Sequence, residues 1–251
     1  MNDFELTVLE NTFISGRLWR MRLHAPSLAP RIRAGHFLMV EVSPTNDPIG
    51  RRAFAVGDLR GEELVLFYDV VGRGTRLMKD MGKGHRLRAF GPLGKGLFRH
   101  EGDRHLLVGG GVGLAGLTLL GKELRRMGKE VVFVYGARSA EHLGMVEWLR
   151  EEGFDFILFT EDGSAGRKGL VTEVLGEFGR EWIVSACGPK AMLRALQEEV
   201  RETGHRLYVS LEERMACGWG VCLGCVVWKR DGKPARVCYE GPVFDGGEVR
   251  L

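Results

Sequence analysis

The stretch Cys217-Gly-Trp-Gly-Val-Cys-Leu-Gly-Cys225 decides how the last part of this 251-residue chain folds. With Cys238 it completes the spacing C-x4-C-x2-C-x12-C. Three thiolates from one short loop and a fourth from farther along the chain form the plant-type ligand set of a 2Fe-2S cluster. The glycines let the backbone turn toward the inorganic sulfides, and the apolar residues exclude water. The spacing therefore predicts a cluster held by Cys217, Cys222, Cys225 and Cys238, in a protein that moves single electrons.

Two other uses of these cysteines stay open. Four cysteines also hold structural zinc, but zinc sites usually pair two short C-x2-4-C knuckles, and Cys238 stands alone. Disulfides are disfavoured because residues 1–11 carry Asp3, Glu5 and Glu10 and do not resemble a signal peptide. We therefore expect reduced thiols and a cytoplasmic protein.

Composition excludes several classes of partner. The net charge is +3, and 36 basic and 33 acidic residues are interspersed without a long basic run, so we expect no nucleic-acid partner. No run approaches 18 uninterrupted apolar residues, so we expect no membrane span. The length suits two ordinary domains with a small appendage.

Residues 1–100 carry mostly the period of β-strands. Apolar and polar residues alternate over 19–24, and 36–42, 63–71 and 86–90 are further short candidates separated by Pro, Gly and Asp. Several short strands without a convincing amphipathic helix predict a small antiparallel β-barrel. A β-sandwich is the alternative that this pattern leaves open.

Residues 101–207 alternate between strand and helix patterns. Strands are predicted at 105–108, 131–135, 155–159 and 182–185, and helices at 114–127, 141–151, 171–178 and 189–203. This alternation predicts a doubly wound parallel sheet covered on both faces. The remaining residues, 208–251, are too few for an independent core without a metal.

A glycine-rich turn follows the first of these strands. Gly111-Val-Gly-Leu-Ala-Gly116 satisfies G-x-G-x-x-G between a strand and a helix, which predicts that Gly110, Gly111 and Gly113 approach a dinucleotide pyrophosphate. The second strand ends in Tyr135-Gly-Ala-Arg138, without an Asp or Glu for a ribose hydroxyl. Arg138 is suited to a 2′-phosphate, so the choice between NAD and NADP stays open.

Cys187, Gly188 and Pro189 follow the strand at 182–185 and precede a helix. In an open α/β sheet this is where ligands bind, so we predict that these residues belong to the nicotinamide pocket. Simple packing is the alternative role for Cys187.

Taken in order, the motifs resemble the electron transfer subunits of NAD-dependent dihydroorotate dehydrogenase, in the ferredoxin-reductase superfamily. The resemblance spans nearly the whole chain and is most specific over 210–225 and 237–245. It implies an N-terminal antiparallel FAD-binding β-barrel (1–100), a central doubly wound NAD-binding domain (101–207) and a small C-terminal 2Fe-2S domain (208–251).

The same resemblance implies the flavin site. Arg52-Ala53-Phe54-Ala55 is similar to the family's R-P-x-S motif, whose arginine meets the FAD pyrophosphate. Further implied contacts are Phe67, Tyr68, Asp69, Gly72, Gly74 and Thr75, and Gly91-Pro-Leu-Gly94 resembles the loop that closes the barrel. Ala53 and Ala55 replace the motif's Pro and Ser, and Gly116 replaces a proline of the family pattern. These departures leave the affinity and redox potential of the flavin open.

The function implied is that of an oxidoreductase subunit in pyrimidine biosynthesis. A partner FMN subunit oxidises dihydroorotate, and electrons pass through the 2Fe-2S cluster and FAD to NAD+ in a heterotetramer. No catalytic residue is predicted in this chain, which has no Ser-His-Asp set or evident general base. The alternatives are the small subunit of another NAD(P)H-ferredoxin oxidoreductase or hydrogenase complex, and a zinc-stapled nucleotide-binding module.

Overall fold

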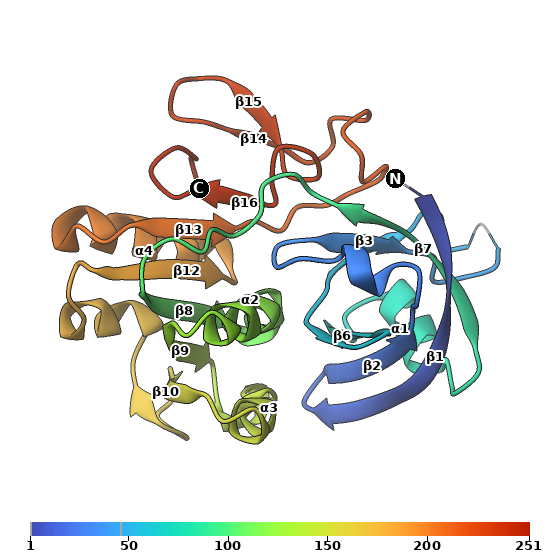
Figure 1. Ribbon diagram of the computed structural model, residues 1–251, viewed down its shortest axis with the longest axis horizontal. Helices are drawn as coiled ribbons and strands as arrows, with labels where there is room; N and C mark the ends of the chain where they lie inside the picture. The colour runs from blue at the N-terminus through green and yellow to red at the C-terminus, as the bar shows by residue number, and fades with distance from the viewer. Residues whose placement is uncertain (1, 46) are drawn as a thin grey trace.

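Two seven-stranded sheets stand side by side in the computed structural model, which describes residues 2–45 and 47–251 (Figure 1). The first has the order β4-β3-β7-β1-β2-β6-β5, with antiparallel pairs throughout. This confirms the predicted N-terminal β-barrel. Its elements are β1 (Asn2–Ser15), β2 (Leu18–His24), the 3-10 turn η1 (Ala29–Arg31), β3 (Phe37–Val40), β4 (Arg52–Ala55), β5 (Asp58–Arg60), β6 (Glu63–Asp69), α1 (Arg73–Lys79) and β7 (Arg86–Leu93).

The barrel differs from the expectation in two places. A short helix, α1, interrupts the strands; its first turn is held by Thr75 Oγ1, which accepts from the backbone N–H groups of Val71 and Gly72 at 3.0 and 3.1 Å. Seven residues are too few for a helical period to stand out in the sequence. In addition, 91–93 completes β7 rather than forming a loop.

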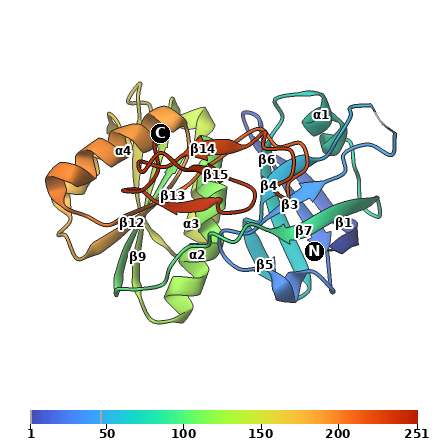
Figure 2. The same cartoon turned by 90° about the horizontal axis from the view of Figure 1, so that it is seen from above.

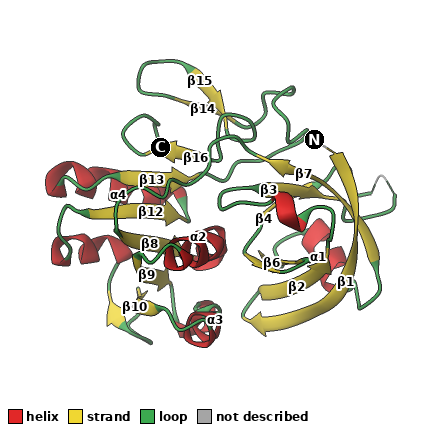
Figure 3. Ribbon diagram, viewed as in Figure 1, coloured by secondary structure: helices red, strands yellow, loops and turns green. Residues whose placement is uncertain are grey.

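The second sheet has the order β11-β10-β9-β8-β12-β13-β16, and all its pairs are parallel except β13 with β16. Figures 2 and 3 show α2 and α3 on the face toward the barrel and α4 on the opposite face, as the doubly wound prediction requires. Its elements are β8 (Arg104–Gly110), η2 (Gly111–Leu114), α2 (Ala115–Arg126), β9 (Glu130–Ala137), η3 (Ala140–His142), α3 (Val146–Glu151), β10 (Asp155–Thr160), β11 (Arg167–Lys168), η4 (Val171–Glu177), β12 (Trp182–Cys187), α4 (Lys190–Thr203) and β13 (Leu207–Ser210).

Two of the predicted helices are shorter than expected or of a different type. The helix expected over 141–151 is split into η3 and α3, with Gly144 between them, where the chain meets Ser15 and Leu18 of the barrel. The helix expected over 171–178 is the 3-10 element η4. The close contact with the barrel accounts for the break at Gly144.

The C-terminal segment binds to both sheets (Figure 1). Its strands are β14 (Val226–Trp228), β15 (Pro234–Arg236) and β16 (Val243–Asp245). β16 pairs with β13 at the edge of the parallel sheet, and Pro242 forms a bridge to Gly96, just after the barrel. The predicted division at residue 207 falls within β13, so the three-domain division stays a prediction.

The apolar cores cross these divisions. One cluster joins barrel residues such as Leu66 to Leu117 and Leu120 of α2, and the other joins Met39 to Phe244 near the C-terminus. The interface between barrel and sheet also holds a buried ion pair, Lys122 Nζ to Asp58 Oδ1 at 2.7 Å. In the described ranges, no helix is long and apolar enough to cross a membrane.

Candidate cofactor and electron-transfer site

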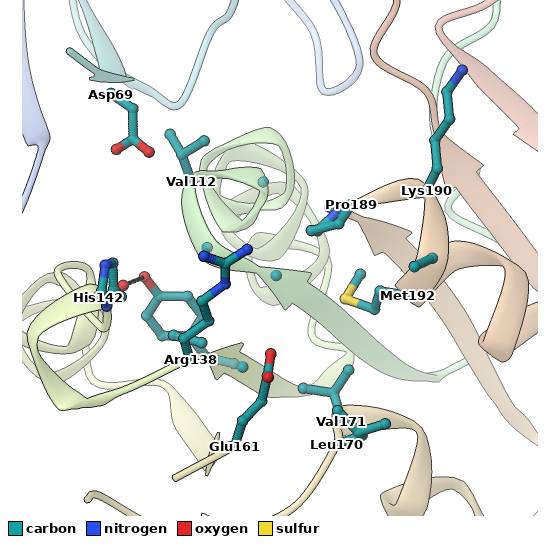
Figure 4. Close-up of a pocket in the computed structure, with 18 of the residues that line it drawn as sticks. Asp69, Val112, Arg138, His142, Glu161, Leu170, Val171, Pro189, Lys190 and Met192 are labelled. Atoms are coloured by element: carbon teal, nitrogen blue, oxygen red, sulfur yellow. Dashed lines mark hydrogen bonds between the residues drawn. The ribbon is translucent and has the colours of Figure 1, made fainter. Parts of the chain in front are cut away.

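A cleft of about 840 Å³ opens where the parallel sheet meets the barrel (Figure 4). The carboxyl ends of β8, β9, β10 and β12 form its floor, and Arg17 and Asp69 reach it from the barrel. Parallel sheets bind their ligands at this edge of the strands. Of the predicted site residues, the cleft is lined by Asp69, Gly110, Gly111, Gly113, Gly188 and Pro189.

The glycine loop lies against the turn after β12. A Cβ atom on Gly113 would lie 2.6 Å from the carbonyl oxygen of Cys187 and 2.7 Å from the Cα of Gly188. Real Cβ atoms do not approach backbone that closely, so any other residue here would force the backbone to move. The two predicted nucleotide segments are therefore in direct contact, and the backbone of the loop is bare where a pyrophosphate would approach it.

Cys187 lies beneath this contact rather than in the cleft. Its side chain is buried, and burial raises the pKa of its thiol. A Cβ atom on Gly116 would lie 3.1 Å from its sulfur, so the glycine that departs from the family pattern packs on Cys187. Its predicted role in the nicotinamide pocket stays a prediction.

Several lining residues were not predicted from the sequence. Glu161 follows β10, His142 lies in η3, and Glu212 follows β13. Burial raises the pKa of the Asp69 carboxyl, while the nearby Arg17 and His142 oppose the shift. Because the carboxyl ends of parallel strands share one edge, Glu161 was open to prediction from the strand pattern; Arg17, from a barrel turn, was not.

The flavin motif occupies β4. Ala53 and Ala55 are exposed, whereas Arg52 and Phe54 are half-buried. Arg52 Nη1 donates to the carbonyl oxygens of Ile49 and Gly50 at 3.1 and 2.9 Å, while its Nη2 donates no hydrogen bond within the described ranges. Its guanidinium also packs on Gly74, where a Cβ atom would lie 3.0 Å from Nε. The motif thus places one half of a guanidinium fork where it can meet a phosphate.

Phe67 and Tyr68 of the implied flavin set lie in the barrel core. Tyr68 is 1% exposed, and its hydroxyl donates to Asn11 Oδ1 at 2.9 Å. Burial raises the pKa of Tyr68 to about 12. Phe67 packs against Gly57. The flavin-binding roles of Gly72, Gly74 and Thr75, beside α1, stay predictions together with those of these two residues.

The four cysteines of the ligand motif lie in one region. The sulfurs of Cys225 and Cys238 are 3.1 Å apart, and Cys217 and Cys222 lie in the adjoining loop, where Cys222 is exposed. No three His, Cys, Asp or Glu side chains in the described part of the chain form a group that would hold a single metal ion. A two-iron cluster spreads its ligands in pairs over two irons, and four cysteine thiolates are the donors that hold the plant-type cluster.

Backbone donors surround the first cysteine. Burial alone would raise the pKa of Cys217, but hydrogen bonds from the backbone N–H groups of Cys222, Trp219 and Val221 and from the Cys222 side chain lower it to about 6. Arg236 holds the same loop, since its Nη1 donates to the carbonyl oxygen of Gly220 at 2.9 Å. The loop is therefore already arranged to stabilise a thiolate.

The cysteine loop is packed on the barrel next to the flavin motif. A Cβ atom on Gly218 would lie 2.4 Å from Met39 Cγ, and the Trp219 ring meets Phe90 edge-on with centroids 5.8 Å apart. Met39 pairs with Ala53 across β3 and β4. One strand therefore separates the cysteine loop from the flavin motif, while Asp69 of the flavin set reaches the nucleotide cleft.

Comparison with known proteins identifies relatives of this arrangement. Residues 212–250 match the family described as the iron-sulfur cluster binding domain of dihydroorotate dehydrogenase B. The electron transfer subunit homolog of dihydroorotate dehydrogenase B (NAD(+)) from Aquifex aeolicus (strain VF5) is 62% identical over 250 residues, 99% of this chain and 99% of that protein. The electron transfer subunit from Bacillus velezensis (strain DSM 23117 / BGSC 10A6 / LMG 26770 / FZB42) is 38% identical over 260 residues, 100% of each.

A solved structure shares the fold over nearly the whole chain. A chain from the structure of an NADH-dependent reduced ferredoxin-NADP oxidoreductase, studied for flavin-based electron bifurcation, superposes with a TM-score of 0.86. The two sequences are 30% identical, and the match covers 97% of this chain and 89% of that one. The barrel, the parallel sheet and the C-terminal segment therefore recur together as one architecture.

Proposed function

Because this chain belongs to the family of electron transfer subunits of dihydroorotate dehydrogenase B, we propose that it carries electrons from a partner FMN subunit, which oxidises dihydroorotate, to NAD+. The observation that supports this most is the convergence of the three predicted sites. The cysteine loop packs on Met39, Met39 pairs with Ala53 of the flavin motif, and Asp69 of the flavin set lines the nucleotide cleft. We further propose a cytoplasmic heterotetramer that serves pyrimidine biosynthesis.

The residues fit the groups that this function needs. When bound, a 2Fe-2S cluster, FAD and NAD supply transfer of single electrons, conversion between one and two electrons, and acceptance of hydride. Within this chain, Cys217, Cys222, Cys225 and Cys238 would hold the irons. Arg52 would bind a flavin phosphate through its Nη2, and the open backbone at Gly111, where a Cβ atom would meet nothing within 4 Å, would bind the dinucleotide pyrophosphate.

The partner is proposed to contact the exposed apolar side chains around the cysteine loop. Trp219, Val221 and Leu223 are 50%, 72% and 60% exposed, although the loop is otherwise anchored to the barrel. Exposed apolar groups gathered on one loop are typical of an interface, and tryptophan is a frequent anchor. A subunit docked here would also shield Cys222 from water.

Spectroscopy of the anaerobically purified protein tests the proposal. We expect a flavin absorption band and, after reduction with dithionite, the low-temperature EPR signal of a 2Fe-2S cluster. Cys222→Ser should abolish the EPR signal and leave the flavin band, whereas Cys187→Ser, which alters the cysteine outside the ligand motif, should keep both. Protein that contains zinc and no flavin, or that remains free of iron after reconstitution, would contradict the proposal.

A second function is favoured by the 30% identity to the chain of the ferredoxin-NADP oxidoreductase. A subunit of such a complex would exchange electrons with another acceptor. Purification of the tagged chain from its native cell separates the two functions. An FMN protein that oxidises dihydroorotate supports the first, and a co-purifying partner without that activity supports the second.

A further inference from the structure

The ends of β9 and β10 place a cation and a carboxylate side by side in the cleft. The two strands pair in parallel, with Ala137 opposite Thr160, and the backbone N–H of Glu161 donates to the carbonyl oxygen of Ala137 at 3.2 Å. Arg138 and Glu161 therefore occupy matching positions just beyond the two strands. Both side chains line the cleft and point toward it (Figure 4).

Neither side chain is engaged elsewhere. Within the described ranges, the Arg138 guanidinium and the Glu161 carboxylate form no hydrogen bond and no ion pair within 4.0 Å, with each other or with other side chains. Both residues are exposed in the open cleft. Their opposite charges are therefore available to a ligand rather than used to hold the fold.

The neighbouring carboxylates are already occupied. Asp162 Oδ1 accepts from the backbone N–H and the hydroxyl of Ser164, at 2.9 and 2.6 Å. Glu173 accepts from the backbone N–H of Leu170 at 2.8 Å. Of these three acidic residues, Glu161 is the one with an uncommitted carboxylate facing the cleft.

This arrangement differs from the usual one in doubly wound sheets. There, an acidic residue after the second strand accepts a hydrogen bond from the 2′-hydroxyl of the adenosine ribose, and an arginine nearby accommodates a 2′-phosphate. Here Arg138 follows the second strand and Glu161 follows the third. A 2′-hydroxyl satisfies both side chains, because it donates to the Glu161 carboxylate and accepts from the Arg138 guanidinium. A 2′-phosphate is attracted by Arg138 and repelled by Glu161.

We propose that Glu161 selects NAD over NADP in this chain by accepting a hydrogen bond from the adenosine ribose and repelling a 2′-phosphate. The inference rests on the proposed function, because it requires a dinucleotide in this cleft. Rejection by a like charge is a common route to specificity, since it penalises the wrong ligand without strengthening the right one. Arg138 alone would favour NADP.

Binding of two fragments tests this without any redox step. The probes are ADP-ribose and 2′-phospho-ADP-ribose, titrated calorimetrically into the anaerobic holoprotein at low salt. Wild type should prefer ADP-ribose, and Glu161→Gln should shift the ratio of dissociation constants by about tenfold toward the phosphorylated probe, because one nearby negative charge is removed. The ratio of kcat/KM for NADPH over NADH should move the same way.

Two further variants sharpen the test. Glu161→Gln combined with Arg138→Gln should lose the affinity gained for the phosphorylated probe. Glu151→Gln makes the same chemical change at an exposed position outside the cleft and should leave the ratio unchanged. A ratio within twofold of wild type in Glu161→Gln, with both probes still bound, would overturn the role of Glu161 while leaving the proposed function intact. Wild type that binds neither probe would overturn the dinucleotide site itself.

Discussion

Residue 113 has no room for a side chain. The Cβ of an alanine at this position would lie 2.6 Å from the carbonyl oxygen of Cys187, and backbone on both sides must then move apart. The contact joins the glycine loop to the turn after β12, so a small change at one residue displaces two nucleotide-binding segments. Overpacking of this kind typically costs about 1–3 kcal/mol.

We therefore expect Gly113→Ala to lower the free energy of unfolding by about 1–3 kcal/mol and to weaken NADH binding at least about tenfold. Urea unfolding and a fluorescence titration with NADH measure the two effects. Gly82→Ala is the matched control, because a Cβ atom there meets no atom within 4 Å. NADH affinity that is equal in Gly113→Ala and Gly82→Ala would show that the tight contact does not shape the site.

Among the elements, β1 and β2 are joined by a charged cluster at Glu10. Thr12 Oγ1 and Arg22 Nη1 donate to its carboxylate at 2.7 and 2.8 Å. These hydrogen bonds, from Thr12 first and then Arg22, lower the pKa of Glu10 from its ordinary 4.5 to about 2. The folded protein therefore binds fewer protons at Glu10 than the unfolded chain does, so this stabilisation is present above pH 4.5 and is lost as the pH falls toward 2.

Glu10→Gln should lower the free energy of unfolding at pH 7 by no more than about 1 kcal/mol, since the carboxylate is partly exposed and screened. The difference from wild type should shrink between pH 4.5 and pH 2.5. Urea unfolding across this range measures it, with Glu151→Gln as a charge-matched control that forms no ion pair within the described ranges. A difference that stays constant with pH would assign the effect to something other than ionisation.

The elements that the sequence predicts best are those with an uninterrupted period. β8 and α2 lie close to their expected bounds, because a buried strand, a glycine turn and an apolar helical face follow in order. β1 is the longest strand of the described chain, yet its alternation is broken by irregularities between Val8 and Glu10 and between Phe13 and Ser15, so no strand was expected there. Local pattern is informative only where the strand pairs regularly.

For the candidate site, too, local signals in the sequence were predictive and long-range contacts were not. The cysteine spacing and the glycine turn are local signals, and each could be predicted from one short stretch of sequence. The packing of Gly218 on Met39 and the position of Arg17 in the lining of the cleft depend on segments far apart in the chain. No local pattern records such contacts, which is why the sequence predicts the separate sites better than their junction.

For the whole molecule, the proposed cluster ligands are part of a core that reaches both sheets. Cys225 and Cys238 lie in the same apolar cluster as Met39 of the barrel and Val209 of β13. Residues 208–251 have little core of their own, so we expect metal binding to contribute directly to the folding of this segment.

Removal of iron should therefore loosen the C-terminal segment first. We expect hydrogen exchange after anaerobic chelation to speed up by at least about tenfold over 212–245 and at β13, while β1 and β2 keep their protection. Mass spectrometry of peptides from the iron-loaded and iron-depleted protein measures this. Exchange that rises equally in β1 and β2 would mean that the cluster supports the entire fold, and no change in 212–245 would mean that it supports none of it.

The antiparallel strand β16 has a consequence for engineering. It closes the exposed edge of β13, although it lies beyond the last cysteine of the ligand motif. An unpaired edge strand invites association with other chains. A C-terminal redox module truncated just after Cys238 would therefore lack β16 and leave the edge of β13 unpaired. For transplantation into another protein, only a segment that extends through Asp245 carries both the four cysteines and the strand that anchors them to the sheet.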